Sequence, residues 1–153
     1  MDHILKEASL LLNQKYNVQP VLYGSFALEK VTQTSFQAKD IDLLVPSYLL
    51  DRKKQLILLF TTHGFEYVQK EVLTFRKDSI DVELADYDKW DFLCEFKQTQ
   101  NRMIKTGEAT YILMGKHNLL KLYHYLYKDR SRSILKHQED IKKLKALNRL
   151  IEV

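Results

Sequence analysis

Two segments that alternate carboxylates with apolar residues constrain the fold of this chain most strongly. The sequence DIDLLVP begins at Asp40, and the sequence IDVEL begins at Ile80. Successive side chains of a strand point to opposite faces, so each segment is expected to be a strand with one apolar and one acidic face. Asp40 and Asp42 share a face of the first strand, as Asp81 and Glu83 do on the second. The sequence therefore predicts two strands that each present a carboxylate face.

A glycine and a serine come before the first acidic strand. Gly24 ends a short strand expected over residues 18–23, and the helix-forming residues of SFALEKV follow it. We therefore expect a strand, a tight turn and the start of a short helix. Gly24 lets a phosphate approach the backbone, and Ser25 adds a hydroxyl at a helix start, where free N–H groups favour anions. Both are candidate nucleotide-binding residues.

Helical and strand periodicities divide the rest of the chain. Apolar residues at helical spacing predict helices over residues 3–15, 47–62, 90–103, 117–128 and 133–151. Asp2 is the expected N-cap of the first helix. An antiparallel meander and a short edge strand are expected over residues 65–69, 73–76, 80–84 and 109–114. The predicted fold class is α/β (α+β), with a mixed, partly antiparallel sheet, flanking helices and C-terminal helices.

The length and charge distribution indicate one domain with a basic tail. The 153 residues, of which 45% are hydrophobic, suffice for a single core over 1–153. We divide it into a core, residues 1–115, with 14 basic and 16 acidic side chains, and a helical appendage, residues 116–153, with 10 basic and 4 acidic ones. The appendage suits contact with polyphosphate or nucleic acid, and a solvated helical surface explains its charge equally well.

Several classes of protein and site are disfavoured by composition. Cys94 is the one cysteine, so the chain forms no internal disulfide, and its apolar neighbours indicate a core position. The histidines at 117, 124 and 137 lack a zinc-binding pattern, although His137 remains a candidate for touching nucleotide. The opening segment is too polar for a signal peptide, and no apolar run is long enough to span a membrane. We expect a soluble, cytoplasmic protein that does not engage a membrane.

The acidic strands suggest chemistry with a divalent metal. Asp40 and Asp42 have Cα atoms about 7 Å apart on one face, so their side chains can converge on one ion. Magnesium prefers hard oxygen ligands and is commonly held by one or two carboxylates with substrate phosphates. A third carboxylate can bind a second ion or take a proton from the attacking hydroxyl. Asp81 is the candidate for that role, and Glu83 is the alternative on the same face.

The order of these elements resembles the DNA polymerase β-like nucleotidyltransferase superfamily, in particular its small bacterial members. The resemblance rests on LYGSFAL, KDIDLLVP and SIDVEL, spans residues 18–84, and extends more loosely to NLLKLYHYLYKDR and KHQEDIKKL. It implies a mixed sheet, Mg²⁺ at the aspartates, and transfer of a nucleoside monophosphate from a nucleoside triphosphate such as ATP, with release of pyrophosphate. The chain is thus expected to be an enzyme.

The resemblance also assigns roles to individual residues. By position, Gly24 and Ser25 match the phosphate-contacting turn, and Asp40 and Asp42 match the two catalytic metal ligands. Asp81 matches the third carboxylate, which is catalytic and metal-binding. Lys121 and Asp140 match two weaker tail positions. Of the tail positions, Lys121 is expected to bind nucleotide.

The chain departs from the family pattern directly after the Gly-Ser turn. Many members have an arginine and a second glycine there, where this chain has Ala27, Leu28 and Glu29. Basic groups from elsewhere must then neutralise the phosphates. The candidates are Lys116, Lys121, Lys128, Arg130 and Lys136.

Two classes of function are open at this point. The first is a magnesium-dependent nucleotidyltransferase whose acceptor is a small molecule, RNA or protein. The second is a module that keeps the fold and binds nucleotide or nucleic acid with little or no turnover, or that serves as a partner subunit. Since a second substrate domain is not evident, three arrangements are open: the acceptor docks on the basic C-terminal helices, it is a partner protein, or it binds at a homodimer interface.

Overall fold

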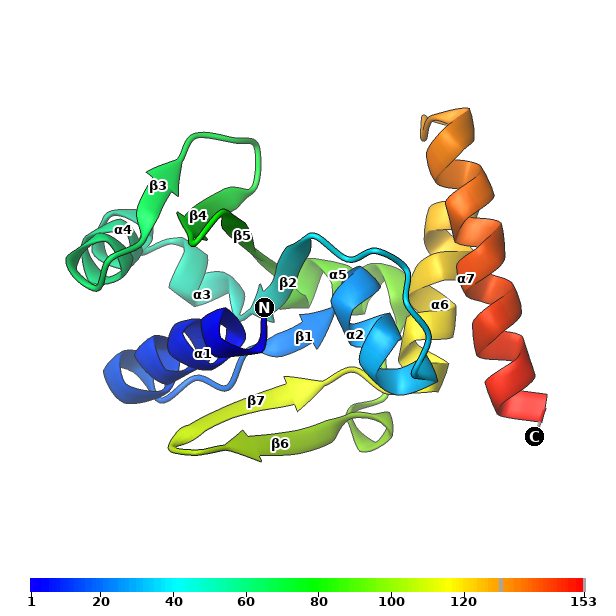
Figure 1. Ribbon diagram of the computed structural model, residues 1–153, viewed down its shortest axis with the longest axis horizontal. Helices are drawn as coiled ribbons and strands as arrows, with labels where there is room; N and C mark the ends of the chain where they lie inside the picture. The colour runs from blue at the N-terminus through cyan, green and yellow to red at the C-terminus, as the bar shows by residue number, and fades with distance from the viewer. Residues whose placement is uncertain (130, 153) are drawn as a thin grey trace.

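A mixed β-sheet forms the centre of the molecule, which a computed structural model describes over residues 1–129 and 131–152 (Figure 1). In this part of the chain the sheet has seven strands in the order β3-β4-β5-β2-β1-β7-β6. In chain order, β1 to β7 are Val21–Tyr23, Asp40–Val45, Glu66–Val68, Leu73–Lys77, Ile80–Asp86, Arg102–Thr106 and Ala109–Leu113. β2 runs parallel to β5 and β1 runs parallel to β7, and the other neighbours are antiparallel. The expected fold class is confirmed.

Helices flank this sheet. α1 to α7 are Asp2–Tyr16, Gly24–Thr32, Ser47–Leu50, Lys53–Thr62, Tyr87–Cys94, Lys116–Tyr127 and Ile134–Glu152, and a short 3-10 turn covers Gln98–Gln100. α6 and α7 lie side by side at the right of Figure 1, at the opposite end of the molecule from β3 and α4. No helix in the described ranges is both long and apolar enough to cross a bilayer.

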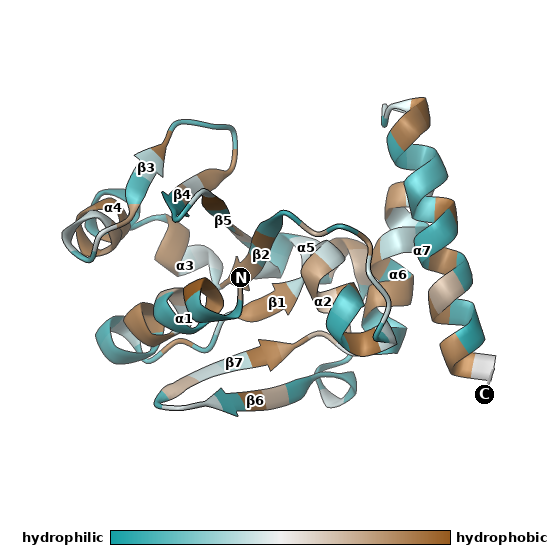
Figure 2. Cartoon of the chain, in the orientation of Figure 1, coloured by the Kyte–Doolittle hydropathy of each residue, from teal (hydrophilic) through white to brown (hydrophobic). Residues whose placement is uncertain are grey.

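One face of the sheet is apolar and buried. Fully buried side chains on this face come from three neighbouring strands, as with Leu22, Ile41 and Val82. α1 packs against β5 and β7, while Phe60 of α4 stacks on Phe75 of β4 with ring centroids 4.3 Å apart. Figure 2 shows the resulting alternation of hydrophobic and hydrophilic turns along α1. Burial of this face leaves the opposite face of β2 and β5 to carry the carboxylates.

Several predicted boundaries are wrong. The helix expected over 47–62 is two helices, because the backbone leaves helical geometry at Arg52. The helix expected over 90–103 begins at Tyr87 and stops at Cys94, and Glu95 is left-handed with φ 54°. The segment that follows pairs as β6 with β7, across a turn at Gly107 with φ 59°.

Two further details also differ from expectation. β7 is an inner strand, because β6 covers its outer side, so the expected edge strand is not at the edge. Met1 is the N-cap of α1, and Asp2 stands in the first turn, where its carboxylate binds Lys30 at 2.6 Å.

The stacked pair in the core gives a stability prediction. Phe60→Ala removes a fully buried ring and leaves a cavity against Phe75, so we expect the free energy of unfolding to fall by about 3–5 kcal/mol. Urea denaturation followed by circular dichroism measures the change. Leu58→Ala is the control, because Leu58 lies on the same helix and is 69% exposed. Equal losses in the two variants would contradict this packing.

Candidate active site

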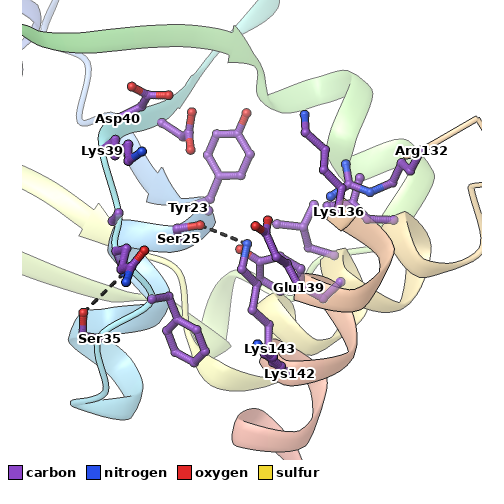
Figure 3. Close-up of a pocket in the computed structure, with 18 of the residues that line it drawn as sticks. Tyr23, Ser25, Ser35, Lys39, Asp40, Arg132, Lys136, Glu139, Lys142 and Lys143 are labelled. Carbon is purple, nitrogen blue, oxygen red and sulfur yellow. Dashed lines mark hydrogen bonds between the residues drawn. The ribbon is translucent and has the colours of Figure 1, made fainter. Parts of the chain in front are cut away.

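A cleft of about 840 Å³ separates the carboxylate face of β2 from the α6/α7 pair. Tyr23 of β1, the start of α2 and residues 35–39 form one wall, and side chains from α6, α7 and the segment before α7 form the other. Figure 3 shows Lys136, Glu139 and Lys143 across the cleft from Ser25 and Asp40. The wall formed by the C-terminal helices is rich in lysine, whereas the opposite wall carries the two aspartates.

The parallel pairing of β2 with β5 brings four carboxylates together. Asp40 is in register with Asp81, and Asp42 is in register with Glu83. Residues in register on paired strands point to the same face, so the four side chains form a two-by-two array. The expected sharing of a face within each strand is therefore present, and the register adds which carboxylates are neighbours.

Asp42 is a half-buried member of this array. Burial raises the pKa of its carboxyl well above the usual value, and a hydrogen bond with Glu83 and the charges of Glu83 and Asp40 raise it further. The charge of Lys143 acts in the opposite direction. Accumulated like charge at a half-buried carboxylate is relieved by a proton or by a cation, so the chemistry of this array fits a divalent metal ion. Among the described residues, however, no three potential ligands already stand in metal-binding geometry.

Asp81 has different surroundings. Lys70 donates to its Oδ2 at 2.8 Å, and Arg76 donates through Nε and Nη2. The hydrogen bond from Arg76, followed by that from Lys70, lowers the pKa of Asp81. The structure thus places Asp81 beside Asp40 and under two cations, and it brings Glu83 against Asp42. Of the two candidates for the third carboxylate, Glu83 is the direct neighbour of Asp42.

Gly24 lies so close to Asp42 that a side chain would not fit at position 24. Its φ of +75° is rarely adopted by residues with a side chain, and a Cβ atom added there would collide with Oδ2 of Asp42. The turn that begins α2 therefore lies directly against the carboxylate strand. Ser25, the next residue, accepts a hydrogen bond at 3.0 Å from Nζ of Lys143. The predicted turn and the predicted aspartate pair meet at one point of the cleft.

Lys143 on α7 is the cation nearest this point. Its Nζ lies 5.0 Å from the ring centre of Tyr123, and burial lowers its pKa. Arg132 also lines the cleft and binds the fully buried Asp140 through Nε at 2.8 Å and Nη2 at 3.0 Å. This two-pronged ion pair joins the segment before α7 to the helix that carries Lys143.

The predicted basic residues are placed unequally. Lys136 lines the cleft, whereas Lys116, Lys121 and Lys128 do not. Lys121 instead donates to the carbonyl of Glu95 at 2.7 Å. Arg130 lies outside the described residues.

Sequence reasoning missed the cleft lysines at 142 and 143. A signal was present, because Lys143 follows Lys136 by seven residues, which is two helical turns along one face of α7.

The remaining candidates have structural roles in the described part of the chain. His137 stacks on Tyr127 with ring centres 4.3 Å apart, and its Nε2 lies 2.9 Å from the carbonyl oxygen of Tyr127. Cys94 is buried, as expected, and burial raises the pKa of its thiol to about 11. A thiol with this pKa stays protonated at neutral pH and is a poor nucleophile.

Solved structures define the class of this fold. An antigenic nucleotidyltransferase-like protein from Paracoccidioides brasiliensis matches 95% of this chain and 76% of its own, with 18% identity and a TM-score of 0.65. ANT(2")-Ia in complex with adenylyl-2"-tobramycin matches 99% of this chain and 90% of its own, with 13% identity and a TM-score of 0.57. Lincomycin-bound LnuA, a lincosamide antibiotic adenylyltransferase, matches 95% of this chain and 94% of its own, with 14% identity and a TM-score of 0.52. The chain has the nucleotidyltransferase fold, which confirms the resemblance at the level of structure.

A sequence relative defines the family. The chain is 30% identical over 140 residues to the uncharacterized protein YnaI of Bacillus subtilis (strain 168), across 91% of this chain and 90% of that protein. The chain belongs to the YnaI family. No family model matches it.

The raised pKa of Asp42 predicts a stabilising substitution. The folded chain holds this proton more tightly than the unfolded chain, so stability falls as pH rises from about 3.9 through the raised pKa and stays reduced above it. Asp42→Asn removes the charge, so we expect its melting temperature at pH 7 to exceed that of the wild type by about 2–4 °C, or roughly 1 kcal/mol. The difference should shrink toward pH 4.

Thermal melts across pH 4–8 without added metal measure this effect. Asp51→Asn is the control, because Asp51 is an exposed aspartate at the end of α3. A wild type at least as stable as Asp42→Asn at pH 7 would show that the charge of Asp42 does not destabilise the folded chain.

Proposed function

We propose that this chain is a metal-dependent nucleotidyltransferase that moves a nucleoside monophosphate from a nucleoside triphosphate to an acceptor hydroxyl. The observation that carries the proposal is the close approach of Gly24 to Asp42, which sets the Gly-Ser turn directly against the carboxylate cluster of β2 and β5. Such chemistry depends mainly on positioning and on stabilising charge around the transferred phosphoryl group. A turn for phosphates and carboxylates for a cation, at one point of a cleft, support that requirement.

Asp40 and Asp42 would hold Mg²⁺, with Glu83 as the third carboxylate. A bound Mg²⁺ would supply charge stabilisation at the transferred phosphate and orient it. Glu83 is 24% exposed and adjoins Asp42, so it is placed to accept the proton of the attacking hydroxyl. Asp81 stays ionised under Lys70 and Arg76, which makes it a weaker proton acceptor and the second candidate.

Ser25 and the N-terminal amides of α2 would hold the β- and γ-phosphates from one side of the cleft. Lys143 would hold them from the other, because its ammonium group already meets the hydroxyl of Ser25. We propose that Lys143, with Lys136 farther along the same helix face, replaces the basic residue absent after Ser25. In the transfer, a bond forms between the acceptor oxygen and the α-phosphorus, and the bond from that phosphorus to pyrophosphate breaks.

A second candidate function is nucleotide binding without turnover. The observation that favours it is the sequence Ala27, Leu28 and Glu29, which leaves the turn itself without a cation. This alternative predicts nucleotide binding without pyrophosphate release, so the activity experiment separates the two candidates.

The activity experiment compares carboxylate variants. The protein is incubated with Mg²⁺, α-labelled nucleoside triphosphates and cell extract as a source of acceptors, and both pyrophosphate release and transferred label are measured. We expect Asp42→Asn to lower both by at least about 100-fold, and Glu83→Gln to lower them more than Asp81→Asn. Equal activity of the wild type and Asp42→Asn would contradict the proposal. Binding without release in the wild type would favour the second candidate.

The cation on α7 gives a binding prediction. Lys143→Ala removes the ammonium at Ser25, so we expect its affinity for a non-hydrolysable ATP analogue with Mg²⁺ to fall by about 10-fold, or roughly 1.4 kcal/mol. The single tryptophan, Trp90, lines the cleft, and its fluorescence follows the titration. Lys145→Ala is the control, because Lys145 is an exposed lysine two residues along α7 that does not line the cleft. Equal affinities in the two variants would remove Lys143 from the site.

A further inference from the structure

The position of the phosphates fixes the side from which an acceptor arrives. In phosphoryl transfer the attacking and leaving oxygens lie roughly in line with the phosphorus. If the proposed function holds, the leaving pyrophosphate lies at Ser25 and Lys143, where α2 begins. The attacking hydroxyl must then enter from the opposite side of the aspartates.

The sheet register identifies what lies on that side. Starting at Tyr23, next to Gly24, the row of residues in register runs through Asp42 and Glu83 to Thr74 of β4. The next row runs from Asp40 through Asp81 to Arg76. An acceptor that reaches Asp42 from this direction therefore lies over β5 and β4.

Two exposed cations stand on this part of the sheet. Lys70, in the segment between β3 and β4, is 41% exposed, and Arg76 on β4 is 42% exposed. Nζ of Lys70 also lies 3.8 Å from Oε1 of Glu83, so Lys70 reaches the carboxylate proposed to take the proton. Both cations are within reach of an acceptor whose hydroxyl lies at Glu83.

Asp81 does not use all the donors of these two cations. Arg76 binds both oxygens of Asp81 through Nε and Nη2, and Lys70 lies between Asp81 and Glu83. Nη1 of Arg76 has no hydrogen-bond partner among the described residues, and Lys70 has further protons to donate. Glu66 is opposite Arg76 on β3, and the charges of Glu66 and Asp40 add to that of Asp81 in raising the pKa of Arg76. The two cations are held in place by Asp81, and their remaining donors are available to an anion.

We infer that Lys70 and Arg76 bind a phosphate group of the acceptor, so the acceptor is a phosphate-bearing alcohol. This inference rests on the proposed function, because it takes the direction of attack from the position of the pyrophosphate. The phosphate belongs either to a nucleic acid strand or to a small phosphorylated sugar. A polyamine acceptor would meet two like charges beside the attacked phosphorus.

A binding experiment tests the inference without requiring turnover. The wild type is first saturated with Mg²⁺ and the non-hydrolysable ATP analogue. Three probes are then titrated by calorimetry: a short single-stranded oligoribonucleotide with a free 3′-hydroxyl, ribose 5-phosphate, and the polyamine tobramycin. We expect at least one phosphate probe to bind and tobramycin not to bind. Binding of the oligoribonucleotide alone identifies a strand end as the source of the phosphate, and binding of ribose 5-phosphate identifies a small molecule.

Variants assign the binding to the two cations. Lys70→Gln keeps a hydrogen-bond donor for Asp81 but loses the positive charge. Arg76→Lys keeps the positive charge but loses the paired hydrogen bonds of the guanidinium group. Both variants should fold, and thermal melts will check this. We expect each to weaken binding of the phosphate probe by about 5- to 10-fold. Lys54→Gln, at an exposed lysine of α4, should not change it.

Failure of this inference is distinguishable from failure of the proposed function. If the ATP analogue binds but neither phosphate probe does, or if both cation variants bind the probe as well as the wild type, the acceptor inference is overturned and the nucleotidyltransferase proposal stands. Failure of the analogue and Mg²⁺ to bind at all overturns both.

Discussion

The close approach of Gly24 to Asp42 is the constraint on which the rest of the site depends. The end of β1 pairs with β2, with Tyr23 opposite Asp42, and a Cβ atom at the next residue, position 24, would collide with that aspartate. The apolar face of the same strands is fully buried under α1 and α4, which prevents β2 from turning its carboxylates inward. Packing on one face thus fixes the acidic chemistry on the other.

Electrostatics then link the C-terminal helices to the carboxylate face. A charged, half-buried Asp42 beside Glu83 and Asp40 is unfavourable in isolation, and the charge of Lys143 counters it from across the cleft. The ammonium itself loses solvation there, as its lowered pKa shows. The buried pair of Asp140 with Arg132 anchors the same helix. Substrate phosphates and a divalent cation would bring opposite charge to both of these strained groups.

Periodicity sufficed to predict both acidic strands, the Gly-Ser turn and the C-terminal helices, because each is a local pattern. It did not predict the register of β2 against β5, which depends on strands about 40 residues apart and sets Glu83, rather than Asp81, against Asp42. The choice of Lys143 over Lys121 likewise depends on how the C-terminal helices pack. The β6–β7 hairpin was missed because its mixed sequence suggested a continuing helix and its turn depends on Gly107.

A crystal structure with Mn²⁺ and a non-hydrolysable ATP analogue would show whether the carboxylates of β2 hold the metal, because anomalous scattering locates Mn²⁺ directly. The account predicts a metal peak at the carboxylates of Asp40 and Asp42, with the terminal phosphates between Ser25 and Lys143. Metal and triphosphate bound elsewhere, or an analogue bound without metal at these aspartates, would contradict it.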